Sequence, residues 1–163
     1  MSTERSLEPF DRLSGVWTTE ATHPAMPGVV VRGTSVFEWL EGEHFLILRA
    51  HSDHPDFPDF ISIIGHTEHG RADATTGMAP ASTGQSPIHM HYFDSRGVFR
   101  DYGASMDATT WRIWREDPGF SQRFAGTLSD DGDSIDGRWQ VCRDGVHWAD
   151  DVAITYRRTT EHE

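Results

Sequence analysis

Short runs of apolar and β-branched residues alternate with polar positions along most of the chain, and clusters of Gly, Asp and Pro separate these runs. A spacing of about 8 to 12 residues between such clusters is typical of antiparallel all-β domains. Helical periodicity is confined to SLEPFDRL at 6–13, which predicts one or two helical turns with Ser6 as the N-cap. We predict ten strands, at 15–23, 29–40, 44–52, 60–68, 87–94, 98–106, 110–116, 120–128, 134–142 and 146–157.

Most connections between these strands have the composition of tight turns. They supply Asp, Pro and Gly where hairpin turns favour them, in DSRG at 94–97, DATT at 107–110, DPGF at 117–120 and RDGV at 143–146. Consecutive strands should therefore pair, which predicts an all-β, antiparallel up-and-down barrel of about ten strands. Two connections are longer, a Pro-braced loop at 53–59 and a low-complexity segment at 69–86 that we expect to be flexible. With a short tail at 159–163, the chain is interpreted as a single domain over 1–163.

The turns also predict which side chains face inward, because the side chains of a strand alternate between two faces. The turn at 129–134 is expected to pair Phe124 with Trp139, Gly126 with Gly137 and Leu128 with Ile135. Followed upstream from hairpin to hairpin, this apolar face is predicted to line the barrel with Gln122, Arg115, Trp111, Asp101, Phe99, Phe93, His91 and His89. The opposite face, which carries Arg100 and Arg123, is assigned to solvent.

The strand at 44–52 has two apolar faces. Phe45 and Ile47 lie on one of them, and Leu46 and Leu48 lie on the other. We predict that the face of Phe45 and Ile47 points into the barrel, opposite Phe37 and Trp39.

Composition narrows the classes of partner. The formal net charge of −12 opposes binding to nucleic acid or to anionic lipid surfaces. A single cysteine rules out an intramolecular disulfide, and the opening MSTERSLEPFDRL lacks the apolar core of a signal peptide, so a cytoplasmic location is expected. No apolar run reaches the roughly 20 residues of a membrane-spanning helix, so no membrane association is expected. A homodimer through exposed Tyr and Trp side chains stays open.

The stretch LSGVWTTE places Gly15-Val16-Trp17 after the predicted helical turn, and this resembles the Gly-x-Trp that opens the first strand of lipocalins and other calycin barrels. The resemblance implies that the tryptophan closes one end of the barrel against a basic residue of the last strand, here Arg157 or Arg158. The count of ten strands is more similar to fatty-acid-binding proteins and nitrobindins. Over 12–158 the chain resembles a bacterial family of lipocalin-like barrels with no established activity, on the phrases FEWLEGEHFLI, DHPDFPD, YFDSRGV and DPGFSQRF.

Two features of those families are missing. The last strand reads ITYRR and lacks the Arg-x-Tyr pair that grips carboxylates in many fatty-acid-binding proteins. Trp17 is followed by TTE, so the Gly-x-Trp-x-Gly-x-Gly opening of nitrobindins is absent, and no motif surrounds His147 or His162. Haem binding is therefore disfavoured.

The strongest candidates for a functional site are His89, His91 and Asp101, and three interpretations of them stay open. His-x-His on a strand projects both imidazoles to one face and resembles part of a cupin metal motif, although Ser95 replaces the glutamate of that motif. Alternatively, His91 and Asp101 form an acid–base pair, with Arg115 and Gln122 orienting a substrate. In the third interpretation these side chains only form a polar patch in a wet barrel.

A barrel of this size commonly encloses a cavity. The preferred hypothesis is a binding protein for a small hydrophobic or amphipathic molecule, with no cofactor and no metal. The expected lining consists of His89, His91, Phe93, Phe99, Asp101, Trp111, Arg115, Gln122, Phe124 and Trp139. The alternative is an isomerase, cyclase or hydrolase-like enzyme in which His91 and Asp101 are catalytic, and a metal- or haem-binding barrel is the weaker alternative.

Overall fold

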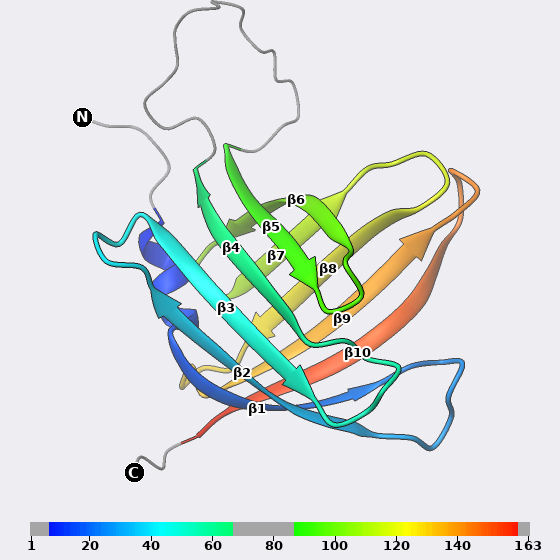
Figure 1. The fold of residues 1–163 in the computed structure, drawn as a ribbon, viewed down its shortest axis with the longest axis horizontal. Coiled ribbons are helices and arrows are strands. Elements are labelled where there is room, and N and C mark those ends of the chain that lie inside the picture. Colours follow the sequence, from blue (N-terminus) through cyan, green and yellow to red (C-terminus); the bar gives the residue numbers. More distant parts are fainter. Residues whose placement is uncertain (1–6, 67–86, 160–163) are drawn as a thin grey trace, which may run out of the picture.

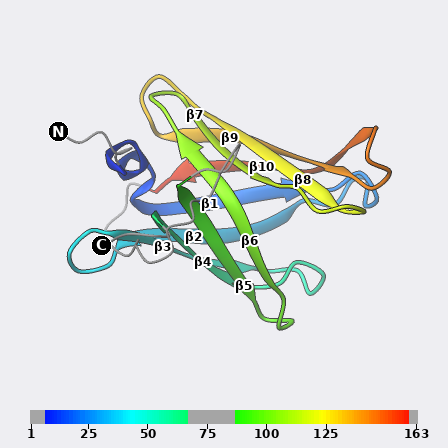
Figure 2. The same ribbon diagram turned by 90° about the horizontal axis from the view of Figure 1, so that it is seen from above.

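The computed structural model describes residues 7–66 and 87–159. Ten antiparallel strands close into a barrel in which each strand pairs with its neighbours in the chain and β1 pairs with β10 (Figures 1 and 2). The prediction of an all-β up-and-down barrel of about ten strands is confirmed.

The strands follow the predicted ranges closely. They are β1 (Gly15–Thr22), β2 (Val31–Trp39), β3 (Phe45–Ser52), β4 (Phe60–His66), β5 (Ile88–Asp94), β6 (Phe99–Met106), β7 (Thr110–Arg115), β8 (Ser121–Leu128), β9 (Ser134–Cys142) and β10 (Trp148–Arg158). The predicted end of the fourth strand at 67–68, the loop at 69–86 and the tail beyond 159 lie outside the described residues.

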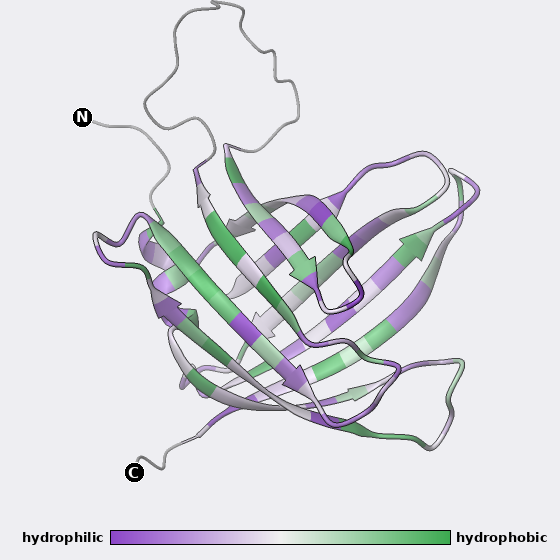
Figure 3. Cartoon of the chain, viewed as in Figure 1, coloured by the Kyte–Doolittle hydropathy of each residue, from purple (hydrophilic) through white to green (hydrophobic). Residues whose placement is uncertain are grey.

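Burial alternates along β1 and β8 with a period of two. Figure 3 shows hydrophilic and hydrophobic positions interspersed along the strands. Along β8, Gln122, Phe124 and Leu128 are buried while Arg123 is exposed. The pairs expected between β8 and β9 are confirmed, with Phe124 opposite Trp139. The pairing of Arg115 with Gln122 and of His91 with Asp101 is confirmed as well.

A short 3-10 helix, η1 (Glu8–Leu13), lies at one end of the barrel and buries Phe10 and Leu13 in the core. The predicted N-cap, Ser6, lies outside the described residues, and Leu7 precedes the helix without a side-chain cap. The indole N–H of Trp17 donates to the Leu13 carbonyl over 2.9 Å, which ties the helix to the first strand. Among the described residues, no helix has the length and apolar character needed to cross a membrane.

Arg158 closes the same end of the barrel. Its guanidinium carbon lies 4.1 Å from the ring centroid of the buried Trp17, and its Nη1 and Nη2 donate to the carbonyls of Ser14 and Arg12 over 2.6 and 2.8 Å. The contact between Trp17 and a basic residue of the last strand, which the resemblance implied, is therefore present, and Arg158 makes it.

The turn between β6 and β7 lies at the predicted residues, DATT at 107–110, but the faces predicted across it are wrong by one residue. Met106 pairs with Trp111 across this turn, whereas the predicted faces required Ser105 on the side of Trp111. The carboxylate of Asp107 accepts from the backbone N–H groups of Thr109 and Thr110, both over 2.9 Å, and this stabilises the turn.

A shift of one residue reverses the faces of every strand upstream of it. The prediction that His89, His91, Phe93, Phe99 and Asp101 face the cavity is therefore wrong, and so is the assignment of Arg100 to solvent. On β3 the preferred face is also wrong. Leu46 and Leu48 are buried, and Leu48 pairs with the buried Phe37.

The clamp formed by Arg158 generates a stability prediction. In Arg158→Met the aliphatic stem stays while the backbone hydrogen bonds and the contact with the indole face are lost, and we expect the free energy of unfolding to fall by about 2–4 kcal/mol in urea titrations. Arg157→Met, at an exposed neighbouring position, is the matched control and should change it by less than about 0.5 kcal/mol. Equal effects of the two substitutions would contradict the role given to Arg158.

Candidate functional site

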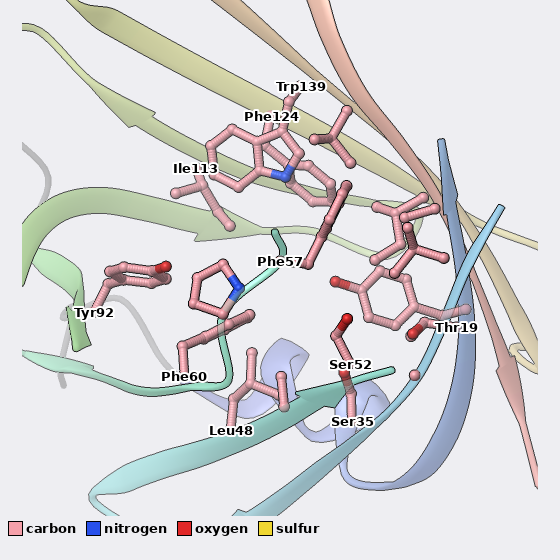
Figure 4. A pocket seen from close by; sticks show the side chains of 18 of the residues that line it. Thr19, Ser35, Leu48, Ser52, Phe57, Phe60, Tyr92, Ile113, Phe124 and Trp139 are labelled. Carbon is pink, nitrogen blue, oxygen red and sulfur yellow. The ribbon is translucent and has the colours of Figure 1, made fainter. Parts of the chain in front are cut away.

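The barrel encloses a cavity of about 230 Å³. Figure 4 shows Leu48, Phe60, Ile113, Phe124 and Trp139 around it, on strands from both halves of the chain. Aromatic side chains supply much of the wall, namely Phe57, Phe60, Tyr92, Tyr102, Trp111, Phe124, Trp139 and Tyr156. A concave, mostly apolar site with a few polar groups is the usual form of a small-molecule site.

The aromatic rings of the wall pack against one another rather than standing free. Trp111 meets Phe124 edge to face with ring centroids 5.0 Å apart, and Phe124 meets Trp139 at 5.1 Å. Trp139 in turn contacts Tyr102 at 5.9 Å. Such contacts fix the orientation of the rings, so this part of the cavity is formed before any ligand binds.

The loop between β3 and β4 lies beside the cavity, because Phe57 and Pro58 are part of its lining. Phe57 is held through the backbone, where its N–H donates to the His54 carbonyl over 3.0 Å, and its ring contacts the His54 ring. The carboxylate of Asp59 lies 3.0 Å from His51 Nδ1 and also accepts from the backbone N–H of Ser52. The Pro-braced loop at 53–59 is thus an ordered part of the cavity wall.

Three polar side chains of the wall lie on β6 and β8, the two strands that flank β7. Tyr102 donates its hydroxyl to Oε1 of Gln122 over 3.2 Å, and Arg100 lies on the same face of β6 as Tyr102. Burial raises the pKa of Tyr102, and hydrogen bonding to Arg100 opposes part of that rise. The phenol is therefore a neutral donor at pH 7, next to one permanent positive charge.

Only part of the predicted lining lies in the cavity. Trp111, Gln122, Phe124 and Trp139 line it. Arg115 does not, because its Nη2 binds Asp117 over 2.7 Å and its Nη1 donates to the Phe120 carbonyl across the β7–β8 turn.

The other predicted residues gather on the outer wall. Oδ1 of Asp101 lies 2.6 Å from His89 Nδ1 and 3.5 Å from His91 Nε2. Phe93 and Phe99 beside them are 44% and 57% exposed. His89, His91 and Asp101 therefore meet as expected, but outside the cavity.

On β5 and β6 the prediction missed the even-numbered positions that line the cavity, Met90, Tyr92, Arg100 and Tyr102. It also named no lining residue from β1 to β4 or from β10, which contribute a large part of the wall, including Leu48, Phe60 and Tyr156. Ile88 and Met90 are more apolar than the histidines between and after them, and this contrast within β5 was the signal that favoured the correct face. Phe57 was also missed, since nothing in the sequence shows that a loop side chain turns inward.

Tyr92 is positioned by the β5–β6 turn. Its hydroxyl donates to Oδ2 of Asp94 over 2.7 Å, and the same carboxylate binds Arg96 and accepts from the backbone N–H groups of Arg96 and Val98. Hydrogen bonding to Arg96, followed by that to Tyr92, holds the pKa of Asp94 far below its usual range although burial opposes this. Gly97 completes the turn with the positive φ expected of it, 88°.

Comparison with known proteins bears on the fold. No protein-family model matches the chain, and no curated protein matches its sequence. The crystal structure of Rv2717c from M. tuberculosis is similar to it, with a TM-score of 0.60 and 12% sequence identity over 98% of this chain and 100% of that protein. A protein of unknown function of the DUF3598 family from Nostoc punctiforme matches with 11% identity over 96% of this chain and 100% of that one, at a TM-score of 0.28. At 12% identity the likeness to Rv2717c shows a shared fold alone.

The buried carboxylate of Asp94 generates a pH prediction. Because the pKa of Asp94 is lower in the folded chain than in the unfolded chain, its contribution to stability is present above about pH 4 and is lost as the pH falls further. We expect Asp94→Asn to lower the free energy of unfolding by about 1–3 kcal/mol at pH 7 and to weaken its dependence on pH between 4 and 2. Asp136→Asn, at an exposed carboxylate, is the control. Identical acid dependence in both variants, measured by urea unfolding, would contradict this role.

Proposed function

We propose that the protein binds a small amphipathic molecule inside the barrel, with its apolar or aromatic part against Trp111, Phe124 and Trp139 and an anionic or carbonyl group near Arg100. One observation carries this proposal. The lining of the cavity combines packed aromatic rings with three polar side chains, Arg100, Tyr102 and Gln122, which we call the polar set.

The size and lining of the cavity support a compact ligand. An apolar cavity of about 150 Å³ is enough to bind benzene. The cavity of this barrel, at about 230 Å³, has room for a single aromatic ring with a short side chain. Rings that are already packed in place lose little conformational entropy when a ligand enters, which favours binding.

The polar set determines which polar group the ligand should carry. A guanidinium binds carboxylates through two parallel hydrogen bonds, and such charge-assisted bonds are about twice as strong as neutral ones. Arg100 is half-buried, so water screens its charge less than it screens the exposed arginines of the outer wall. An aromatic carboxylate therefore suits this cavity better than the corresponding hydrocarbon.

An enzyme that uses His91 and Asp101 inside the cavity is not favoured, because both side chains lie on the outer wall. A substrate held against Trp139 is separated from them by the sheet itself. Binding is therefore the function that the geometry supports best.

Filling the cavity tests the proposal. Ala50 lines the cavity, and Ala125 faces outward between Arg112 and Arg138 with similar partial burial. We expect phenylpropionate to change the fluorescence of the native protein and to appear in ligand-observed NMR, and we expect Ala50→Phe to weaken binding at least about 10-fold while Ala125→Phe leaves it unchanged. Equal binding by both variants would place the ligand outside the barrel.

The polar end has its own test. Phenylpropionate and the neutral propylbenzene are compared in the native protein, in Arg100→Met and in Arg112→Met, where Arg112 is exposed on the outer wall. We expect Arg100→Met to reduce the preference for the acid by about 10-fold, or about 1.4 kcal/mol, because one charge-assisted contact is lost. The Arg112 variant should keep the preference. An unchanged preference in Arg100→Met would contradict the assignment of Arg100.

A further inference from the structure

The outer wall of the barrel carries a cluster with the composition of a metal site. His89, His91 and Asp101 each offer one ligand atom, and these three atoms all lie within 4.8 Å of one another. Among the described residues this is the one group of at least three His, Cys, Asp or Glu side chains that meets this geometry. It lies on the opposite face of the sheet from the cavity, which Met90 and Tyr102 line from the same two strands.

The sheet register brings the three ligands together. His89 and His91 are two residues apart on β5, so both imidazoles project from the same face, with ring centroids 6.0 Å apart and planes inclined by 28°. Asp101 on β6 pairs with His91. Oδ1 of its carboxylate approaches one nitrogen of each ring. The rigid backbone of a closed barrel fixes this arrangement.

The two separations that involve Asp101 fit a small tetrahedral ion after a modest adjustment. With metal–ligand bonds of about 2.0–2.2 Å, the ligand atoms of a tetrahedral Zn²⁺ site are about 3.4 Å apart. The separation between Asp101 Oδ1 and His91 Nε2 is 3.5 Å, while that between Asp101 Oδ1 and His89 Nδ1 is 2.6 Å. Replacing the short hydrogen bond by two bonds to an ion requires the latter pair to separate by about 0.8 Å, which small side-chain rotations supply.

The strand positions paired with the two histidines carry no basic side chain. His91 pairs with Ile63 on β4, and His89 pairs with Gly65 there and with Gly103 on β6. The ring of Phe45 packs against Gly65, and the ring of Trp114 packs where a side chain of Gly103 would lie, 2.6 Å from that position. The outer-wall positions that pair with His89 are therefore filled by aromatic rings rather than by charged side chains.

The outer side of His91 is also covered by an apolar ring. Phe99 stacks on His91 with ring centroids 6.1 Å apart and planes inclined by 17°. The side chains of the cluster are partly shielded as a result, with 21% of His89, 36% of His91 and 48% of Asp101 exposed. Partial exclusion of water strengthens the attraction between a cation and the carboxylate, and the net charge of −12 adds to it.

We propose that His89, His91 and Asp101 bind a divalent first-row transition metal ion, with Zn²⁺ as the reference ion, on the outer wall of the barrel. Two imidazoles and one carboxylate select such ions over Mg²⁺ and Ca²⁺, which prefer oxygen ligands. Three protein ligands leave one tetrahedral position for water or for a donor atom of another molecule, as in the open sites of zinc enzymes. The proposal is independent of the cavity and of its ligand.

Titration of untagged, EDTA-treated protein with Zn²⁺ tests this site. We expect calorimetry to give one saturable site per chain, and we expect Co²⁺ in its place to show the visible absorption of tetrahedral coordination. His91→Ala and Asp101→Asn should each weaken Zn²⁺ binding at least about 100-fold, because each removes a direct ligand. Mg²⁺ at the same concentration should not compete.

The exposed pair of His51 and Asp59, 3.0 Å apart, is the matched control because, within residues 7–66 and 87–159, no third His, Cys, Asp or Glu completes a metal site with it. His51→Ala should bind Zn²⁺ as the native chain does. The proposal is overturned if the native chain shows no saturable Zn²⁺ binding, or if His91→Ala and His51→Ala bind it equally. Circular dichroism and the urea midpoint establish that each variant is folded, and His89→Gln provides a third ligand variant if His91→Ala does not fold.

Discussion

Every other feature of the barrel depends on the closure between its first and last strands. Trp17 pairs with Arg158 across β1 and β10, and the same two side chains stack at the end that η1 covers. Closure joins segments far apart in the chain, so its cost in chain entropy must be offset by strong local contacts. The buried indole and a guanidinium that binds several backbone carbonyls at once provide them. Without this closure the strands would form an open sheet, and the aromatic wall would not enclose a cavity.

Sequence patterns predicted the elements of this fold better than they predicted which side of each element faces inward. Ten strands and the pairs from β7 to β9 follow from alternation and from turns that contain Pro-Gly or Gly, whose geometry is narrow. The β6–β7 turn contains neither. It is held by hydrogen bonds from Thr109 and Thr110 to the Asp107 carboxylate. Its four residues were predicted correctly, but the side chains that face one another across it were predicted one residue out of step. Half of the predicted cavity lining therefore lies on the outer wall of the barrel. The pairing between β5 and β6 was nevertheless predicted correctly, with His91 opposite Asp101.

The hairpin of β5 and β6 contributes to both sites, the cavity on its inner face and the His–Asp cluster on its outer face. Its inner face supplies Tyr92, Arg100 and Tyr102 to the cavity, and its outer face carries the imidazoles and Asp101. The period of two residues separates these sets completely, so a substitution on one face leaves the other chemically unchanged. The two faces still share strand positions and turns. The network around Asp94, which fixes the β5–β6 turn, therefore supports both at once.

Pairing of β1 with β10 also determines how other molecules can approach the protein. In an open sheet, the outer strands present unpaired N–H and C=O groups to which a foreign strand can add. Among the ten described strands each has a partner on both sides, so no such edge remains. Recognition by another chain must then rest on side chains of the outer wall or on the hairpin loops. Surfaces of that kind can diverge by single substitutions without disturbing the hydrogen bonds that hold the barrel together.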